Sequence, residues 1–208
     1  MRTELEHFPP LVAQVIAQTQ RRVLRGETVP AGEKVVSLLE PHSAVIRRGK
    51  LRAPAEFGSK LLLDEVEGGL VTRYAVLDGN PADAAQLPAS LAHHQECFGH
   101  APTLLAGDRG FYSAANEQLA QEAGVAHVAL PKPGARSAER QAHERQGWFR
   151  RARRFRAGIE GRISVLKRGF GLDRCRYHGV AGMERWVGWG VITHNLRLIS
   201  QHPARAGA

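Results

Sequence analysis

The stretch KLLLDEVEGGLVTRYAVL (residues 60–77) has the pattern of a β-hairpin. Residues 60–66 are mostly apolar, residues 70–77 are rich in branched and aromatic side chains, and Gly68-Gly69 lies between the two runs. Two glycines at such a junction are typical of a tight antiparallel turn, because glycine readily adopts the positive φ angles that hairpin turns need. We therefore predict two paired strands here, with Gly79-Asn80-Pro81 ending the second.

Helical and strand patterns alternate after this hairpin. We predict a helix from Asp83 to about Phe98, with the Asp83 side chain as its N-cap and Pro88 interrupting it or kinking it early. Short strands at 103–106 and 126–130 flank a helix from Ser113 to about Ala123. This order predicts an α/β class with a mixed sheet, in which one antiparallel hairpin is joined by strands connected through helices.

The outer parts of the chain are mainly helical. Residues 3–26 form an amphipathic pattern that Gly26 would end, and residues 27–59 look rich in loops. A long basic helical region is predicted over 137–168 and a last helix over 183–200, followed by a frayed tail, 201–208. In the last helix, Trp186 and Trp189 recur at helical spacing with Val187, Val191 and Leu196, which favours a place in the core.

Positive charge is concentrated in one part of the sequence. The 208 residues carry a formal net charge of +9, and residues 131–185 alone hold fifteen Lys and Arg against five acids. A local basic stripe of this kind is typical of a surface that binds a polyanion, whereas a merely soluble basic protein would spread its charge.

Other classes of protein fit the composition poorly. Cys97 and Cys175 are far apart and belong to no CxxC or Cys/His pattern, so a zinc site and a disulfide framework are both disfavoured. The N-terminus is polar, and no apolar run approaches the length that spans a bilayer. A cytoplasmic protein without a membrane partner is the simplest expectation.

Two acidic residues stand out by their context. Asp108 follows a predicted strand in the glycine-flanked turn GDRGF (107–111), where a carboxylate can face a cleft or simply hydrogen-bond its own backbone. Glu160 lies within the basic region, with Arg156 four residues before it and Lys167 seven after, all on one helical face. That face is either a solvated ion-pair surface or, together with Asp108, a site where two acids bind divalent cations beside a phosphodiester.

Five segments together resemble the DDE transposases of bacterial insertion sequences. They are FGSKLLLDEVEGG (57–69), LDGNPADAAQL (77–87), GDRGFYS (107–113), RAGIEGRISVLKRGFGLDRCRYHG (156–179) and WVGWGVITHNLRLI (186–199). The resemblance spans roughly residues 34–200. Asp108 matches the family's second Asp, and Arg156, Glu160 and Lys167 match its Tyr-x2-Arg-x3-Glu-x6-Lys signature, whose Tyr position holds Arg153 here.

This resemblance implies a fold and a chemistry. The fold would be a ribonuclease H-like mixed sheet with flanking helices, and two Mg²⁺ (or Mn²⁺) ions would support cleavage and strand transfer at transposon ends. Asp108 and Glu160 would be the catalytic metal ligands. The side chains expected to contact double-stranded DNA are Arg156, Lys167, Arg153 and Arg109. The intact family implies a homo-oligomer in the bacterial cytoplasm, associated with the nucleoid.

The family's first Asp has no counterpart before residue 57, since neither Asp64 nor Asp83 has the matching context. We therefore expect the C-terminal part of a longer transposase that lacks the first strand and is catalytically impaired. Its expected organisation is a helix and connecting region (1–56), the partial catalytic domain (57–200) and the tail (201–208). The alternatives are a non-enzymatic DNA-binding remnant that competes with intact transposase, and a ribonuclease H-like nuclease or resolvase. The basic run 47–52 would add DNA contacts or solvate a loop.

Overall fold

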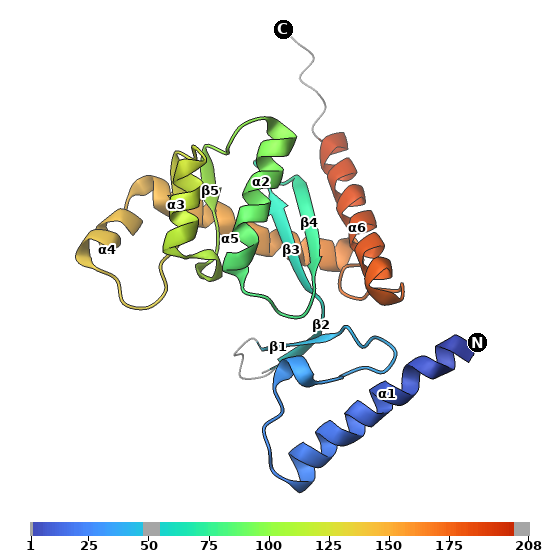
Figure 1. The fold of residues 1–208 in the computed structure, drawn as a ribbon. Coiled ribbons are helices and arrows are strands. Elements are labelled where there is room, and N and C mark those ends of the chain that lie inside the picture. Colours follow the sequence, from blue (N-terminus) through green and yellow to red (C-terminus); the bar gives the residue numbers. More distant parts are fainter. Residues whose placement is uncertain (1, 48–54, 202–208) are drawn as a thin grey trace. The chain divides into compact units, whose positions relative to one another are not determined.

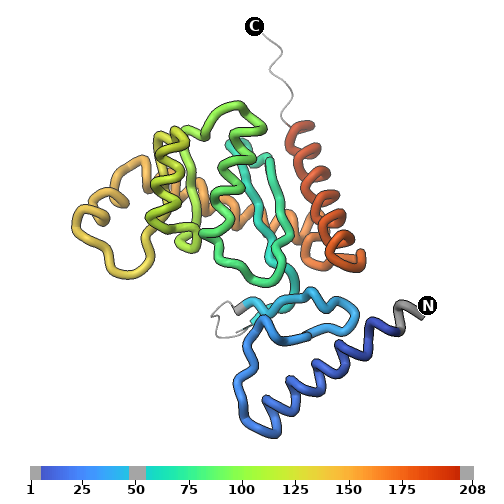
Figure 2. The backbone as a smooth tube through the Cα atoms, viewed as in Figure 1, coloured from blue at the N-terminus to red at the C-terminus, as the bar shows by residue number. Residues whose placement is uncertain are grey.

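The computed structural model describes residues 2–47 and 55–201, which group into two compact units (Figures 1 and 2). The first unit contains the chain up to Leu62 with Ala75–Pro81 and Arg176–Trp186, and the second contains Leu63–Tyr74, Ala82–Cys175 and the chain from Val187. No helix among the described residues has the length and apolar composition needed to cross a bilayer.

The first unit begins with helix α1 (Arg2–Thr19), which continues as a π-helical turn (Gln20–Leu24). Gly26 follows with a φ of 67°, so the predicted helix and its glycine stop are confirmed. The region predicted to be loop-rich instead holds a short antiparallel pair, β1 (Ala44–Arg47) and β2 (Ala55–Gly58), and a 3-10 turn (Ala31–Glu33). Four-residue strands are too short to show a clear alternating pattern. Residues 48–52 of the predicted basic run, and the tail from 202, lie outside the described residues.

Polar side chains fasten the first unit. Gln18 of α1 accepts a hydrogen bond from the Val35 amide (3.0 Å) and donates one to the Val35 carbonyl (2.9 Å). The Glu40 carboxylate accepts a hydrogen bond from the Gly179 amide (3.2 Å) at the start of α6 (Gly179–Gln201) and lies 2.9 Å from Nδ1 of His178. Segments distant in sequence are thereby joined through charge and backbone groups.

The second unit holds the remaining elements, with the hairpin β3 (Lys60–Glu65) and β4 (Val71–Leu77) running into it from the first. They are a 3-10 turn (Asp83–Gln86), α2 (Leu87–Phe98), β5 (Leu104–Ala106), a 3-10 turn (Arg109–Phe111), α3 (Ala114–Glu122), β6 (His127–Ala129), α4 (Ala138–Glu144), α5 (Gly147–Gly169) and α6 from Val187. The helices and strands alternate as the sequence predicts, so the α/β class is confirmed.

The core of this unit forms on both faces of a parallel pair of strands, β5 and β6, in which Leu104 lies opposite His127. Val128 and Leu130 are buried with Leu87 and Leu91 of α2. On the opposite face, Ala129 packs against Phe149 of α5. Successive side chains of a strand point to opposite faces, so Val128 and Ala129 face α2 and α5 respectively.

Sheet pairing differs from the expected single mixed sheet. Among the described residues, the strands form three separate two-stranded sheets: β1 with β2, β3 with β4, and β5 with β6. Strands β5 and β6 contain only three residues each, so they offer few backbone groups for a further partner. The predicted hairpin and the two predicted strands are present, but they are held beside each other by helices.

Three local predictions are corrected. Asp83 does not cap a helix: the N-cap is Ala82, no side chain caps this turn, and the Asp83 carboxylate lies against Gly110 instead. Pro88 falls in the first turn of α2, where its missing amide costs nothing. The long basic helix is two helices, α4 and α5, divided at Arg145 and Gln146.

The core prediction for α6 is partly wrong. Val187 and Val191 are buried and Trp186 is half-buried, but Trp189 and Leu196 are each 61% exposed. The buried face follows the glycines instead. A Cβ on Gly188 would lie 2.6 Å from Oη of Tyr74, and one on Gly190 would collide with Leu172. Close approach at the glycines therefore decides which side of α6 faces inward.

Two side chains lock helices onto the β3–β4 hairpin. Asn195 of α6 accepts a hydrogen bond from the amide of buried Val71 (3.0 Å) and donates one to its carbonyl (2.8 Å), as a neighbouring strand would. Arg162 of α5 pairs with Glu65 (3.4 Å), whose side chain is 7% exposed, and its guanidinium lies where a Cβ of Gly69 would be. The hairpin is thus held by a helix at its strand and by another at its turn.

Replacing Asn195 by Ala should lower the free energy of unfolding by about 2 kcal/mol, because it leaves the buried Val71 amide and carbonyl without partners. Urea denaturation measures this loss. Arg197→Ala, an exposed change two residues away on the same helix, is the control and should alter stability by no more than about 0.5 kcal/mol. Equal stability of the two variants would show that Asn195 does not lock α6 to the hairpin.

Candidate active site and anion pocket

Helix α5 presents two different faces. Phe149, Ala152 and Leu166 are buried, at spacings that place them on one side of the helix. Arg150, Arg153 and Arg154 are exposed on another side. Burial of the apolar side against β5 and β6 therefore fixes the direction in which the arginines project.

The turn after β5 positions Asp108. Its Oδ1 accepts a hydrogen bond from the Arg109 amide (2.7 Å) and so caps the following 3-10 turn. Buried Asn116 donates to the carbonyls of Ala84 (2.8 Å) and Phe111 (2.9 Å), which ties this turn to the preceding one. The ordinary capping role expected of a turn aspartate thus uses one carboxylate oxygen and leaves Oδ2.

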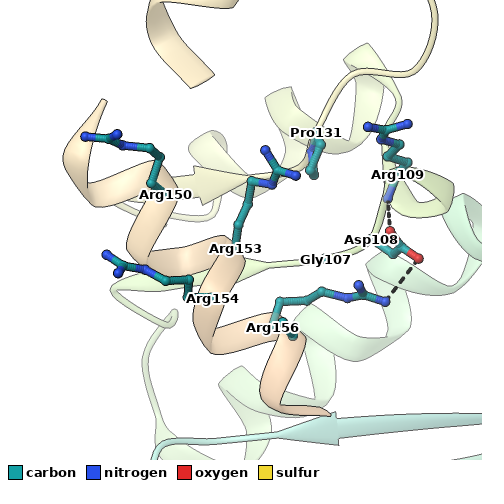
Figure 3. Close-up of a pocket in the computed structure, with 9 residues that line it drawn as sticks. Gly107, Asp108, Arg109, Pro131, Arg150, Arg153, Arg154 and Arg156 are labelled. Carbon is teal, nitrogen blue, oxygen red and sulfur yellow. Dashed lines mark hydrogen bonds and ion pairs between the residues drawn. The ribbon is translucent and has the colours of Figure 1, made fainter. Parts of the chain in front are cut away.

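One guanidinium joins the two predicted catalytic acids. Nη2 of Arg156 lies 3.0 Å from Oδ2 of Asp108, and its Nη1 lies 3.2 Å from Oε1 of Glu160 (Figure 3 shows the pair with Asp108). The side chains of Asp108 and Glu160 are 54% and 68% exposed, against 27% for Arg156. Water screens such pairs, and each contributes no more than about 1 kcal/mol. Acids 52 positions apart in the sequence therefore converge on one cation, loosely held.

Beside this cluster lies a pocket of about 720 Å³. Its lining is dominated by arginines, and the full set is Gly107, Asp108, Arg109, Pro131, Arg150, Arg153, Arg154, Arg156 and Ala157. Figure 3 shows these arginine side chains extending from α5 and from the turn after β5. A cavity with this lining is suited to an anion with several charged oxygens.

The structure brings together most of the residues singled out from sequence. Asp108, Arg109, Arg153 and Arg156 line the pocket, and Glu160 reaches it through Arg156. Lys167, eleven residues beyond Arg156 on α5, is exposed and is not part of the lining. The catalytic, metal-binding and DNA-binding roles of these residues stay predictions.

Sequence reasoning missed Arg150 and Arg154 as members of the site. Both recur with Arg153 and Ala157 at spacings of three and four residues, so they share one helical face. That periodicity was available in the sequence, but the basic region contains so many arginines that spacing alone does not separate pocket residues from the rest. Burial of Phe149 and Ala152 supplies the missing orientation.

The donor atoms suit a hard divalent cation, since Asp108 and Glu160 offer carboxylate oxygens and Arg156 already stands in as their shared cation. The set is small, however. Within residues 2–47 and 55–201, no group of three or more His, Cys, Asp or Glu side chains is placed to hold a metal ion. Two carboxylates are therefore what the described residues contribute.

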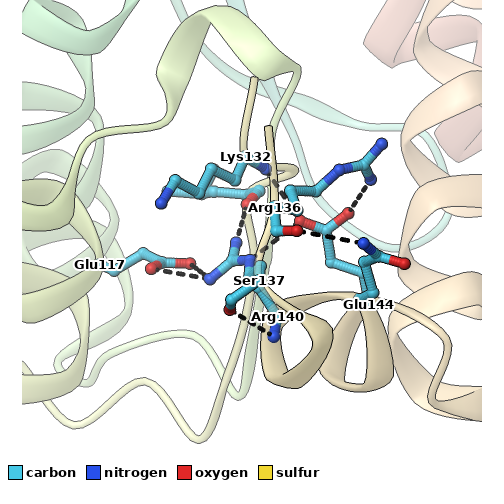
Figure 4. Close-up of polar contacts among 8 residues, drawn as sticks. Glu117, Lys132, Arg136, Ser137, Arg140 and Glu144 are labelled. Atoms are coloured by element: carbon cyan, nitrogen blue, oxygen red, sulfur yellow. Dashed lines mark hydrogen bonds and ion pairs between the residues drawn. The ribbon is translucent and has the colours of Figure 1, made fainter. Parts of the chain in front are cut away.

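A buried ionic network supports the rim of the pocket (Figure 4). Glu144 of α4, whose side chain is 4% exposed, accepts hydrogen bonds from the Lys132 amide (3.0 Å), Arg136 (2.7 Å) and Arg140 (2.9 Å). Arg140 also pairs with Glu117 (2.7 Å) and donates to the Leu130 carbonyl. The network holds the segment after β6 against α3 and α4, and this segment includes Pro131, which lines the pocket.

The Glu144 carboxyl has a lowered pKa although it is buried. Burial favours its neutral form, but the hydrogen bonds from Arg140, the Lys132 amide and Arg136 outweigh burial and lower its pKa from 4.5 to about 2. A folded-state pKa below the unfolded one stabilises the fold above the unfolded value, and this contribution is lost as pH falls through the folded value.

We expect the Glu144 contribution, on the order of 3 kcal/mol, to be full above about pH 5 and to disappear as pH falls toward 2. Glu144→Gln should therefore be much less stable than the unchanged protein at pH 7, with the difference shrinking below pH 4.5. Unfolding free energies measured across this range test it. The control is Glu139→Gln, an exposed acid in the same helix, which should give no such trend.

Comparison with known proteins places the chain. The family model described as a transposase DDE domain matches residues 61–196, which is more than half of the chain. No curated protein and no solved structure shows a significant match. The matched range contains the β3–β4 hairpin, the turn with Asp108, helix α5 and most of α6. The chain therefore belongs to the family of DDE-domain transposases.

Proposed function

We propose that the protein binds double-stranded DNA and acts in metal-dependent DNA cleavage and strand transfer during insertion-sequence transposition. The second unit would be its ribonuclease H-like catalytic domain. The observation that supports this most is the convergence of Asp108 and Glu160 on Arg156 at the edge of an arginine-lined pocket. Carboxylate oxygens that can hold a metal ion, beside cationic side chains that can bind phosphate, are the groups that metal-dependent cleavage of a phosphodiester uses.

Asp108 and Glu160 would hold Mg²⁺ (or Mn²⁺) through their carboxylate oxygens. The bound metal would supply activation of the attacking hydroxyl and stabilisation of the leaving oxygen. The turn after β5 fixes the position of Asp108, because the Arg109 amide donates a hydrogen bond to Asp108 and Asn116 donates one to the Phe111 carbonyl of the same turn. Helix α5 supplies Glu160 from the facing side, so the scissile phosphate would be held between two rigid elements.

Arginines would position the DNA. The side chains of Arg109 and Arg153 make no hydrogen bond or ion pair within the described chain, so both are available for phosphates of the strand being cut. Lys167 lies eleven residues beyond Arg156 along α5, roughly 16 Å at 1.5 Å per residue, and would contact a phosphate further along the duplex. Arg153 stands at the family's Tyr position, so a cation would contact the DNA there in place of an aromatic hydroxyl.

A second candidate is binding without cleavage, in which the protein occupies sites of an intact transposase. It is favoured by the absence of a third acid beside Asp108 and Glu160 among the described residues. Two acids bind a metal more weakly than three in so positive a setting. The two candidates differ in one measurable property, Mg²⁺-dependent nicking of DNA by this chain.

Asp108→Asn and Glu160→Gln should each lower nicking of supercoiled plasmid DNA in Mg²⁺ or Mn²⁺ by at least about a thousandfold, because each removes a charged metal ligand and keeps its shape. DNA affinity, measured by fluorescence anisotropy, should stay within a few-fold of the unchanged protein. Undiminished nicking would reject the assignment of these acids. Binding by the unchanged protein without any nicking would favour the second candidate.

Arg153→Ala should weaken DNA binding similarly for all sequences and reduce the slope of log affinity against log salt by about one, as expected for loss of one phosphate contact. Binding isotherms at several salt concentrations measure this slope. Arg197→Ala, an exposed arginine on α6 outside the pocket, is the control. An unchanged slope in Arg153→Ala would exclude Arg153 from the DNA contact.

A further inference from the structure

Arg156 takes part in two environments at once. Its two terminal nitrogens contact Oδ2 of Asp108 and Oε1 of Glu160. The same side chain lines the arginine pocket. Among the pocket arginines, it is the one that is paired with protein carboxylates within the described residues, whereas Arg109, Arg150, Arg153 and Arg154 have no such side-chain partner there.

The atoms that Arg156 contacts are those that a metal would need. Oδ1 of Asp108 already accepts the Arg109 amide at 2.7 Å, so Oδ2 is the oxygen left for a cation. Arg156 holds that oxygen at 3.0 Å. A divalent cation on the same oxygen would lie beside the guanidinium, and the two positive charges would compete for it. Metal binding by Asp108 and Glu160 therefore requires Arg156 to leave at least one of them.

The pocket offers Arg156 another partner. Arg109, Arg153 and Arg156 line the same pocket, so a phosphate bound there by Arg109 and Arg153 would also lie near Arg156. A guanidinium pairs with a phosphate through two parallel hydrogen bonds, as it does with a carboxylate. The exposed pairs with Asp108 and Glu160 are weak, so exchange between the two partners is inexpensive.

We propose that Arg156 is an exchangeable counter-ion that couples metal binding to DNA binding. It neutralises Asp108 and Glu160 before DNA arrives, and it moves to a phosphate in the pocket when DNA binds, which frees both carboxylates for the metal. This inference rests on the proposed function for the identity of the metal and of the DNA. Because coupling between two ligands is reciprocal, DNA raises metal affinity and metal raises DNA affinity by the same factor.

The test measures Mn²⁺ binding to the complete chain by electron paramagnetic resonance, with and without a short random-sequence DNA duplex. Arg156→Ala should bind Mn²⁺ about tenfold more tightly than the unchanged protein without DNA, because the competing cation is gone. Arg156→Gln, which keeps polarity and loses charge, should behave in the same way. Arg154→Ala is the control: it removes an equal charge from the same pocket without touching either acid, and its Mn²⁺ affinity should change by less than about threefold.

The second part of the test is the coupling itself. The duplex should raise the Mn²⁺ affinity of the unchanged protein and of Arg154→Ala, but not that of Arg156→Ala. Mn²⁺ bound by the DNA alone is subtracted with the Asp108→Asn/Glu160→Gln double variant at the same DNA concentration. Chemical denaturation verifies that every variant is folded.

The outcomes separate this inference from the function on which it rests. Unchanged or weaker Mn²⁺ binding by Arg156→Ala, with binding that still depends on Asp108 and Glu160, overturns the counter-ion role and leaves the metal site intact. Equal enhancement by DNA in Arg156→Ala also overturns it. Mn²⁺ binding that survives without DNA in the Asp108→Asn/Glu160→Gln variant rejects the proposed metal site, and the counter-ion role with it.

Discussion

The packing of β6 on both of its faces, through Val128 on one side and Ala129 on the other, is the constraint on which the second unit depends. Leu130 and Phe149 are fully buried on opposite sides of the β5–β6 pair, which leaves β5 and α5 no freedom to separate. The amide of Gly107 continues the pairing by donating to the Ala129 carbonyl at 3.2 Å. Asp108 is the next residue, so its position follows directly from the apolar packing around β5 and β6.

Charge in this molecule is divided between structure and surface. Arg140 and Arg162 form ion pairs with the buried or nearly buried acids Glu144 and Glu65, and these pairs hold elements together. Arg150, Arg153 and Arg154 have no such partner within the described residues and gather around one pocket. The number of basic residues therefore overstates the positive charge available to a ligand. The charge of these three arginines, grouped around one pocket, stays available.

Patterns of local origin were predicted well from the sequence. The hairpin at 60–77, the glycine stop after the first helix and the start of a helix at Ser113 follow from backbone preferences, and the structure confirms them. Errors arose where tertiary contacts decide. Gly188 and Gly190 leave room for Tyr74 and Leu172, so that Trp189 faces outward, and the Asp83 carboxylate packs against Gly110 instead of capping a helix. The sequence suggested a shared site for Asp108 and Glu160 from their chemistry and from the family resemblance, but nothing local reveals that one guanidinium reaches both.

The contact of Arg162 with Glu65 and Gly69 has a consequence for the rotational setting of α5. Consecutive residues of a helix are turned by about 100°, so a slip of one position would swing every side chain of α5 away from its partner. Arg162 engages the hairpin turn and Arg156 engages the Asp108 turn, which fixes the helix at two points less than two turns apart. A side chain at position 69 would displace Arg162 from the hairpin turn. The direction in which Glu160 projects from α5 would then depend on the contact of Arg156 with Asp108 alone.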